Sequence, residues 1–186
     1  MQFDARATAD SRFSTIHHGG AVLPVLYGGE DDVAAASETI FHTVDLPGSA
    51  TRPRRIFIEK FLSWQWSAIE TRRALAMVRL DDDGIAQIGS TRADLIEGSR
   101  ETYAYTRQWA EAIAAAAGAV DGAWWYSRQA PDRWAAVFFE KLPGRSGGVR
   151  PGEIVGHGPA LPFAFPSGTE RLDEIALRFD TTVVRP

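Results

Sequence analysis

Four polar side chains stand beside apolar segments of this sequence, where folding could bring them together. They are Arg12 before Phe13, Tyr27 at the end of an apolar run, Glu38 on the helix expected next, and Ser127 at the end of a later strand. A guanidinium can pair with anions, a carboxylate can stabilise developing positive charge, and hydroxyl groups can position both. Each also has an ordinary alternative as a surface charge, a core ring or a turn residue, which burial statistics favour for each one alone. Their joint occurrence is therefore the feature to explain.

Hydrophobic spacing predicts the elements around these side chains. The apolar run Val22–Tyr27 lies between two Gly-Gly pairs, which is typical of a buried strand. A helix is expected from the acids at residues 30–32 to about Val44, with apolar residues at helical spacing. Because successive helix residues turn by about 100°, Glu38 lies roughly 120° from the centre of the apolar stripe, on its flank. His42, one turn later, borders the same edge.

Further strands and helices are expected along the rest of the chain. The expected strands are 72–80, 123–127, 134–140 and 181–184, and the expected helices are 102–117 and 170–178. The strand at 134–140 is apolar on both faces, so it should be central in its sheet. The stretch Pro143–Pro166 is the longest candidate linker, but too little chain follows it for a second domain. The sequence therefore predicts one mixed helix-and-strand domain over residues 1–186.

Composition excludes several classes of protein. The chain has 186 residues with 20 basic and 24 acidic side chains, a net charge of −4, and an ordinary globular content of 45% hydrophobic residues. The absence of cysteine excludes disulfide scaffolds, thiol nucleophiles, zinc fingers and iron–sulfur centres. The mild acidity argues against direct nucleic-acid binding. No stretch reaches the length of a membrane span and no apolar leader stands at the start, so we expect a cytoplasmic protein.

Familiar catalytic motifs are absent from the sequence. Neither of the two glycine-rich phosphate loops occurs, nor does the Gly-x-Ser-x-Gly turn of serine hydrolases. His17 and His18 are adjacent and would point to opposite faces of a strand, while His42 and His157 stand alone. Without ligand spacing, no metal site is expected.

Basic residues concentrate in one short segment that contains Arg52, Arg54, Arg55 and Lys60. The usual fate of surface charges favours a solvated loop. The alternative is a contact with an anion.

Several segments, taken in order, resemble the RES domain family, which is named for an arginine, a glutamate and a serine. They are Ser11-Arg12-Phe13, Val25-Leu26-Tyr27, the segment Ala36–His42, the segments Asp121-Gly122 and Tyr126-Ser127-Arg128, and Ala136–Glu140. The stretch Leu75–Leu80 is also similar to a characteristic strand of that family. The resemblance is clearest over Arg12–Glu140.

The resemblance implies a fold and an activity. RES proteins have an α+β fold similar to that of ADP-ribosyltransferases, with a mixed β core flanked by helices. They are toxins of bacterial toxin–antitoxin pairs that act on NAD without a metal. The partner implied is a helix-turn-helix (Xre-like) antitoxin that covers the NAD site, and the toxin could form oligomers with itself or with that antitoxin.

The same resemblance assigns a role to each of the four side chains. Arg12 would hold the diphosphate of the dinucleotide, because a planar guanidinium pairs bidentately with such groups. Tyr27 would flank the nicotinamide ring. Glu38 would stabilise the positive charge that develops on the ribose as the nicotinamide leaves. Ser127 would fix the site through hydrogen bonds, since no base stands beside it in the sequence.

Three functions remain open at this point. The first is a toxin that cleaves the nicotinamide–ribose bond of NAD by phosphorolysis or hydrolysis. The second is a mono-ADP-ribosyltransferase that modifies a protein. The third is a non-catalytic binding module that has kept the fold. The sequence does not choose between the first two, because both begin with the same bond cleavage.

Overall fold

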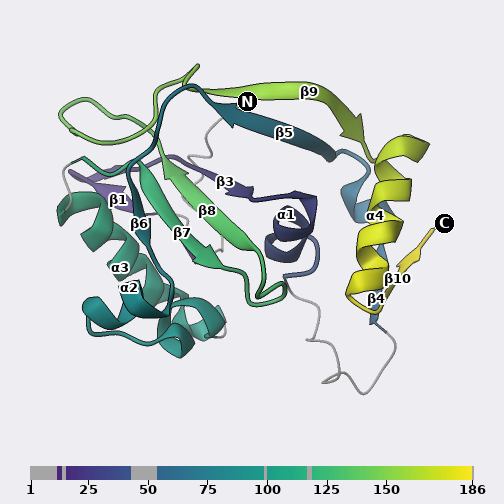
Figure 1. The fold of residues 1–186 in the computed structure, drawn as a ribbon, viewed down its shortest axis with the longest axis horizontal. Helices are drawn as coiled ribbons and strands as arrows, with labels where there is room; N and C mark the ends of the chain where they lie inside the picture. The colour runs from purple at the N-terminus through teal and green to yellow at the C-terminus, as the bar shows by residue number, and fades with distance from the viewer. Residues whose placement is uncertain (1–11, 14–15, 43–53, 99, 117–118, 186) are drawn as a thin grey trace.

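A four-stranded mixed sheet lies at the centre of the molecule (Figure 1). The computed structural model describes residues 12–13, 16–42, 54–98, 100–116 and 119–185. The sheet has the strand order β3 (Val25–Gly29), β8 (Trp134–Phe139), β7 (Gly122–Tyr126) and β6 (Met77–Arg79). Strands β6 and β7 are parallel and the other pairs are antiparallel. The predicted central position of β8 is confirmed, because five of its six residues are buried.

The first predicted strand starts later than expected. Strand β3 begins at Val25 instead of Val22, directly after Pro24, which has no amide hydrogen to donate to a neighbouring strand. The residues before it form a separate two-stranded ribbon of β1 (His17–His18) and β2 (Ala21–Val22). The prediction of 72–80 as one strand was also too long, since β6 covers its last part only.

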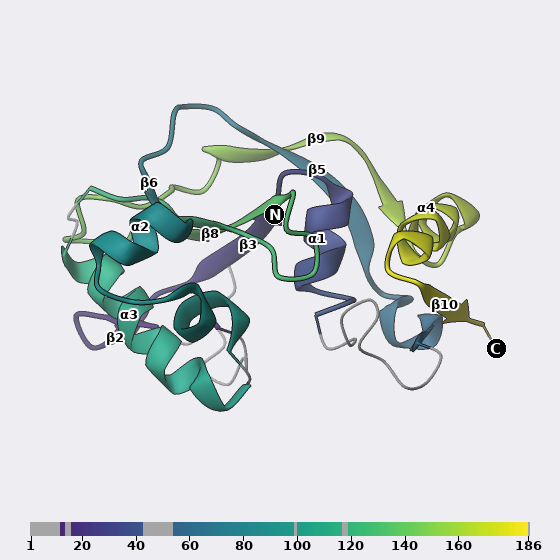
Figure 2. The same cartoon turned by 60° about the horizontal axis from the view of Figure 1, so that its bottom comes forward.

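Two helices cover one face of the sheet, as Figures 1 and 2 show. They are α2 (Asp82–Gln87) and α3 (Tyr103–Ala116), joined through the π-turn η2 (Ala93–Glu97) and the 3₁₀ turn η3 (Arg100–Thr102). Helix α3 confirms the helix predicted over 102–117. Helix α2 was not predicted. It begins in an acidic segment, where its cap Asp81 accepts a hydrogen bond from the amide of Gly84 at 3.0 Å.

A two-stranded arm crosses the other face of the sheet. It consists of β5 (Gln65–Thr71) and β9 (Ile154–Pro162), which pair antiparallel with an irregularity between Trp66 and Ala68. The interpretation of residues 143–166 as a linker was therefore wrong over β9. Proline is tolerated there because the arm is largely exposed and each strand pairs on one side only, where a missing amide hydrogen does little harm.

A third layer lies at the end of the arm. Helix α4 (Pro166–Arg178) packs against the parallel pair β4 (Arg54–Phe57) and β10 (Thr181–Val184), with the 3₁₀ turn η1 (Ile58–Phe61) following β4. The prediction of β10 is confirmed, and α4 begins four residues before the predicted 170, with a proline in its first turn. The hydrophobic core of this layer includes Phe41 and Phe179, whose stacked rings have their centres 4.5 Å apart.

The basic segment is not the solvated loop that composition favoured. Arg54 lies in β4 and is only 7% exposed, and its Nη1 donates to the carbonyl of Phe179. Arg55 is exposed on the same strand, and Lys60 lies over the ring of Phe57. Arg52 falls outside the described residues.

Helix α1 (Asp32–Glu38) joins the central sheet to the third layer. Its cap Asp31 accepts a hydrogen bond from the amide of Ala34 at 2.8 Å. The helix ends at Glu38, not near Val44 as predicted, because the amides of Thr39 and Phe41 both turn back to the carbonyl of Ala36. The chain beyond residue 42 is outside the described part until residue 54.

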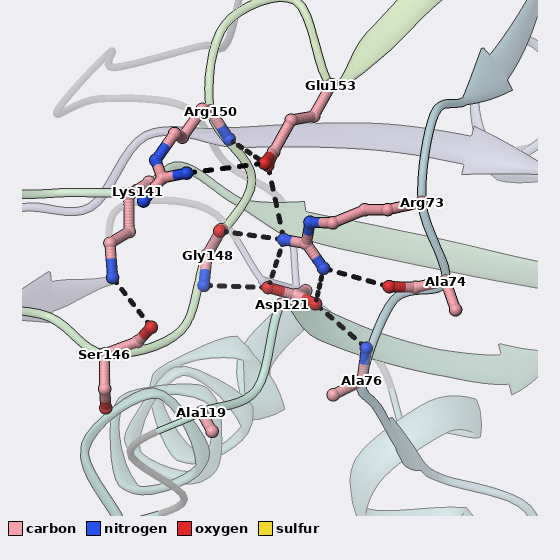
Figure 3. A pocket seen from close by; sticks show the side chains of 10 residues that line it. All are labelled: Arg73, Ala74, Ala76, Ala119, Asp121, Lys141, Ser146, Gly148, Arg150 and Glu153. Atoms are coloured by element: carbon pink, nitrogen blue, oxygen red, sulfur yellow. Dashed lines mark hydrogen bonds and ion pairs between the residues drawn. The ribbon is translucent and has the colours of Figure 1, made fainter.

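An ion pair between the exposed Arg73 and the buried carboxylate of Asp121 locks the edge of the fold where β6 and β7 begin. Figure 3 shows Asp121 in a polar cavity of about 410 Å³, with Arg73 reaching both of its carboxylate oxygens at 2.7 and 2.9 Å. The amides of Ala76 and Gly148 donate to the same carboxylate at 2.9 and 3.0 Å. Gly148 has a φ of +106°, a backbone conformation suited to glycine. Two chain segments, residues 73–76 and the segment around Gly148, therefore meet on the carboxylate of Asp121.

These contacts decide the ionisation of Asp121. Burial alone would raise its pKa, but the hydrogen bonds from Arg73 and the two backbone amides outweigh burial and hold the pKa below its ordinary value. Folding therefore favours the ionised carboxylate. The resulting stability is complete above the ordinary carboxyl pKa and is lost as the pH falls through the lowered pKa of the folded protein.

We expect Asp121→Asn to lower the free energy of unfolding by about 1–3 kcal/mol at pH 7, because Arg73 and two backbone amides lose the buried charge they bind, and Arg73 keeps only Glu153 as an ionic partner. The difference from the wild type should shrink in acid. Urea unfolding at pH 7 and pH 3.5 measures both effects. Asp132→Asn, at an exposed carboxylate, is the matched control; an effect of Asp121→Asn no larger than the control's would contradict the lock.

Candidate functional site

Arg12 is held in place by main-chain carbonyls and an aromatic ring. It is 8% exposed, and its Nη1 and Nη2 donate to the carbonyls of Leu95 and Gly98 at 3.1 and 3.2 Å. The guanidinium carbon lies 5.1 Å from the centre of the Tyr103 ring. Burial lowers the pKa of Arg12, while Tyr103 and Glu38 oppose that shift. An arginine remains charged at neutral pH, so a cation is fixed at the turn η2.

Tyr27 fixes the chain beside this cation. Its hydroxyl accepts a hydrogen bond from the backbone amide of Phe13 at 3.0 Å, next to Arg12. Its ring meets the indole of Trp125 edge-on, with ring centres 6.4 Å apart. Tyr27 therefore connects strand β3 to the segment that carries Arg12.

Glu38 and Ser127 are connected through Ser37. Glu38 is the half-buried last residue of α1. The hydroxyl of its neighbour Ser37 lies 2.8 Å from the hydroxyl of Ser127, and it also donates to the carbonyl of Ala34. Ser127 is fully buried and accepts a further bond from the amide of Gln129. In this structure Ser127 therefore acts on the last turn of α1 and lies away from solvent.

His42 and Arg128 extend the group around Arg12 and Glu38. The Nε2 atom of His42 lies 3.2 Å from the hydroxyl of Tyr103, and Arg128 donates to the main-chain carbonyl of His42 at 3.3 Å. Burial lowers the pKa of His42; Glu38 opposes the shift, and the positive charges of Arg12 and Arg128 add to it. Its surroundings therefore favour the neutral imidazole over the charged one.

We call these five residues the charged cluster: Arg12, Glu38, His42, Tyr103 and Arg128. Its two guanidinium groups outnumber its one carboxylate, so the cluster has a surplus of positive charge in a protein whose net charge is negative. Such a group can hold an anion beside a carboxylate.

The structure brings Arg12, Tyr27 and Glu38 into one region. Ser127 lies in the buried interior next to it, in contact with Ser37. Sequence reasoning missed Tyr103 and did not give Arg128 a role. Arg128 lay in a quoted segment directly after Ser127, which is the signal that could have found it. Tyr103 gave no signal, because its partner Arg12 is 91 positions away in the sequence.

A second cavity, of about 520 Å³, lies between the arm and the end of β3 where α1 begins. Its apolar walls include Trp66 and Ile69, and its rim carries Glu30, Asp31 and Asp32. Three carboxylates disfavour a diphosphate, so this cavity is a poorer anion site than the charged cluster. Within the described ranges, no group of three or more histidine or acidic side chains could hold a metal ion.

The fold and the cluster together define an α+β domain with a cation-rich site around one helical carboxylate. The profile of the RES domain family matches residues 2–165, most of the chain, and the chain belongs to that family. RES domains are toxin-like modules related to NAD chemistry, and they typically pair with antitoxins. No curated protein and no solved structure matches the chain significantly. No helix among the described residues is long and apolar enough to cross a membrane.

The Ser37–Ser127 contact is testable by a double-mutant cycle on stability. We expect each single alanine variant to lower the free energy of unfolding by about 1–2 kcal/mol, because a buried hydrogen bond is lost. The double variant should lose less than the sum, with a coupling of about 1 kcal/mol measured by urea unfolding. Ser67→Ala on the exposed arm is the control, and strictly additive effects would contradict the contact.

Proposed function

We propose that the charged cluster binds NAD and that this chain is the toxin of a toxin–antitoxin pair that breaks the nicotinamide–ribose bond. The observation that carries the proposal is that two cations from distant segments meet next to His42, which follows Glu38 by four residues: Arg128 donates to its carbonyl, and Arg12 lies against the Tyr103 ring whose hydroxyl reaches its Nε2 atom. Membership of the RES family supports the same chemistry in general terms.

The two guanidinium groups suit the diphosphate of a dinucleotide. Arg12 has five N–H donors, and among the described residues two of them are engaged by the carbonyls of Leu95 and Gly98. Arg128 has one bond to the carbonyl of His42. Because both are held by main-chain atoms, they would meet an anion with little further loss of side-chain entropy.

Glu38 suits the reacting sugar. When the bond between ribose C1′ and the nicotinamide nitrogen breaks, its electron pair goes to the nitrogen, and the nicotinamide leaves as a neutral molecule. Positive charge then spreads over the ribose C1′ and ring oxygen, and a fixed carboxylate stabilises it. An oxygen nucleophile completes the reaction by forming a bond to C1′ and releasing its proton to solvent.

Tyr27 and Ser127 would support this reaction by holding Arg12 and Glu38 in position. The Tyr27 hydroxyl is engaged with the amide of Phe13, so it would hold Arg12 in register and offer its ring edge to the nicotinamide. Ser127 would keep the last turn of α1, and with it Glu38, in a fixed position through Ser37.

The nucleophile distinguishes the candidate reactions. Phosphate or water would give phosphorolysis or hydrolysis and deplete NAD, whereas a protein side chain would give ADP-ribosyl transfer. We take NAD depletion as the main proposal, with no metal required. We also propose that the antitoxin is a helix-turn-helix protein that covers the charged cluster, and that both act in the cytoplasm.

The direct test replaces the carboxylate without changing its shape. Purified wild-type protein incubated with NAD, with and without phosphate, should release nicotinamide, and Glu38→Gln should lower the rate about 100-fold or more through lost charge stabilisation. Chromatography of the products measures both rates. Glu174→Gln, at an exposed helical glutamate of α4, is the matched control.

The products decide between the alternatives. ADP-ribose phosphate or free ADP-ribose supports NAD depletion, and label transferred from NAD to protein in a lysate supports ADP-ribosyl transfer instead. No nicotinamide release under any of these conditions would contradict both enzymatic functions and leave the binding module.

A further inference from the structure

We infer that Tyr103 is a positioning residue of the charged cluster. Its ring holds Arg12 and its hydroxyl holds His42. This inference rests on the proposed function, because it assigns Tyr103 to the binding of NAD by the same site.

The ring of Tyr103 supports the guanidinium of Arg12. Tyr103 is the first residue of α3 and is 4% exposed, and the guanidinium carbon lies 5.1 Å from its ring centre. The hydroxyl of Thr106 lies 3.1 Å from the carbonyl oxygens of both Arg12 and Tyr103, so it also connects the backbone at Arg12 to the backbone at Tyr103. An aromatic face attracts a cation more strongly when both are removed from water. The start of α3 thus sets the position of Arg12.

The hydroxyl of Tyr103 reaches the other side of the cluster. It lies 3.2 Å from Nε2 of His42, and the two rings are 6.3 Å apart at 54°. His42 stands four residues after Glu38, and its carbonyl is held by Arg128. Tyr103 therefore ties α3 and Arg12 to the segment that directly follows Glu38 at the end of α1.

Tyr103 acts through its neighbours and would not touch the substrate. Its ring and its hydroxyl are both engaged by residues of the cluster, and almost none of its surface is accessible. Two substitutions of Tyr103 distinguish the two contacts, because phenylalanine keeps the ring and removes the hydroxyl, whereas leucine removes both.

The experiment compares Tyr103→Leu and Tyr103→Phe with the wild type in NAD turnover and in an NMR titration of His42. Tyr103→Leu should raise KM for NAD about tenfold, since an ordered cation contact is lost. Tyr103→Phe should recover most of that KM loss, while the pH midpoint of the His42 ring signals should move from its wild-type value. Tyr105→Leu and Tyr105→Phe, at a 43% exposed ring of the same helix, should change neither.

The outcomes separate this inference from the proposed function. A wild type that releases no nicotinamide overturns the proposed function, and the positioning role with it. A wild type that turns over NAD while Tyr103→Leu keeps its KM overturns the role of Tyr103 alone. If the leucine variant does not fold, Tyr103→Phe decides: a His42 midpoint identical with the wild type contradicts the inference, and a moved midpoint supports it.

Discussion

The burial of one guanidinium is the interaction on which the site depends. A charge taken out of water costs several kcal/mol unless hydrogen bonds and opposite charge compensate it. Arg12 receives two carbonyls from the end of the turn η2, an aromatic face from α3 and the attraction of Glu38 from α1. The turn η2 and the helices α3 and α1 must therefore all be in place before Arg12 can be buried. The same three contacts that compensate the buried cation also bring the residues of the site together.

The surrounding fold keeps these elements in position from two sides. The Arg73–Asp121 pair fixes the starts of β6 and β7 at the far edge of the sheet. At the other end of β7, Ser127 follows the strand and holds α1 through Ser37. Strand β7 thus connects the Arg73–Asp121 pair at one end to the helix that carries Glu38 at the other, and neither the ion pair nor Ser127 belongs to the charged cluster.

The sequence predicted the elements whose evidence is local. Helix α3 has helical spacing and strands β7, β8 and β10 are short apolar or β-branched runs, and they form where these local patterns placed them. The arm strands β5 and β9 were missed because their pairing joins segments about 90 residues apart, and exposure removes the alternation that marks a strand. The early end of α1 depends on a local choice between carbonyl partners that hydrophobic spacing does not encode.

The candidate site divides in the same way. Arg12, Tyr27, Glu38 and Ser127 were found through their order along the chain, and their proposed roles stay predictions. Tyr103 could not be found, because a cation over a ring is a tertiary contact with no spacing rule. The burial of Arg54 was also beyond the sequence, since a basic segment looks the same in a strand as in a loop.

The binding of NAD by the charged cluster can be observed in a crystal structure with a non-cleavable analogue, in which a carbon replaces the ring oxygen of the nicotinamide ribose. We expect the diphosphate in contact with Arg12 or Arg128 and the altered sugar ring beside the Glu38 carboxylate. An analogue bound in the cavity under the β5–β9 arm, with its diphosphate away from both arginines, would contradict this expectation.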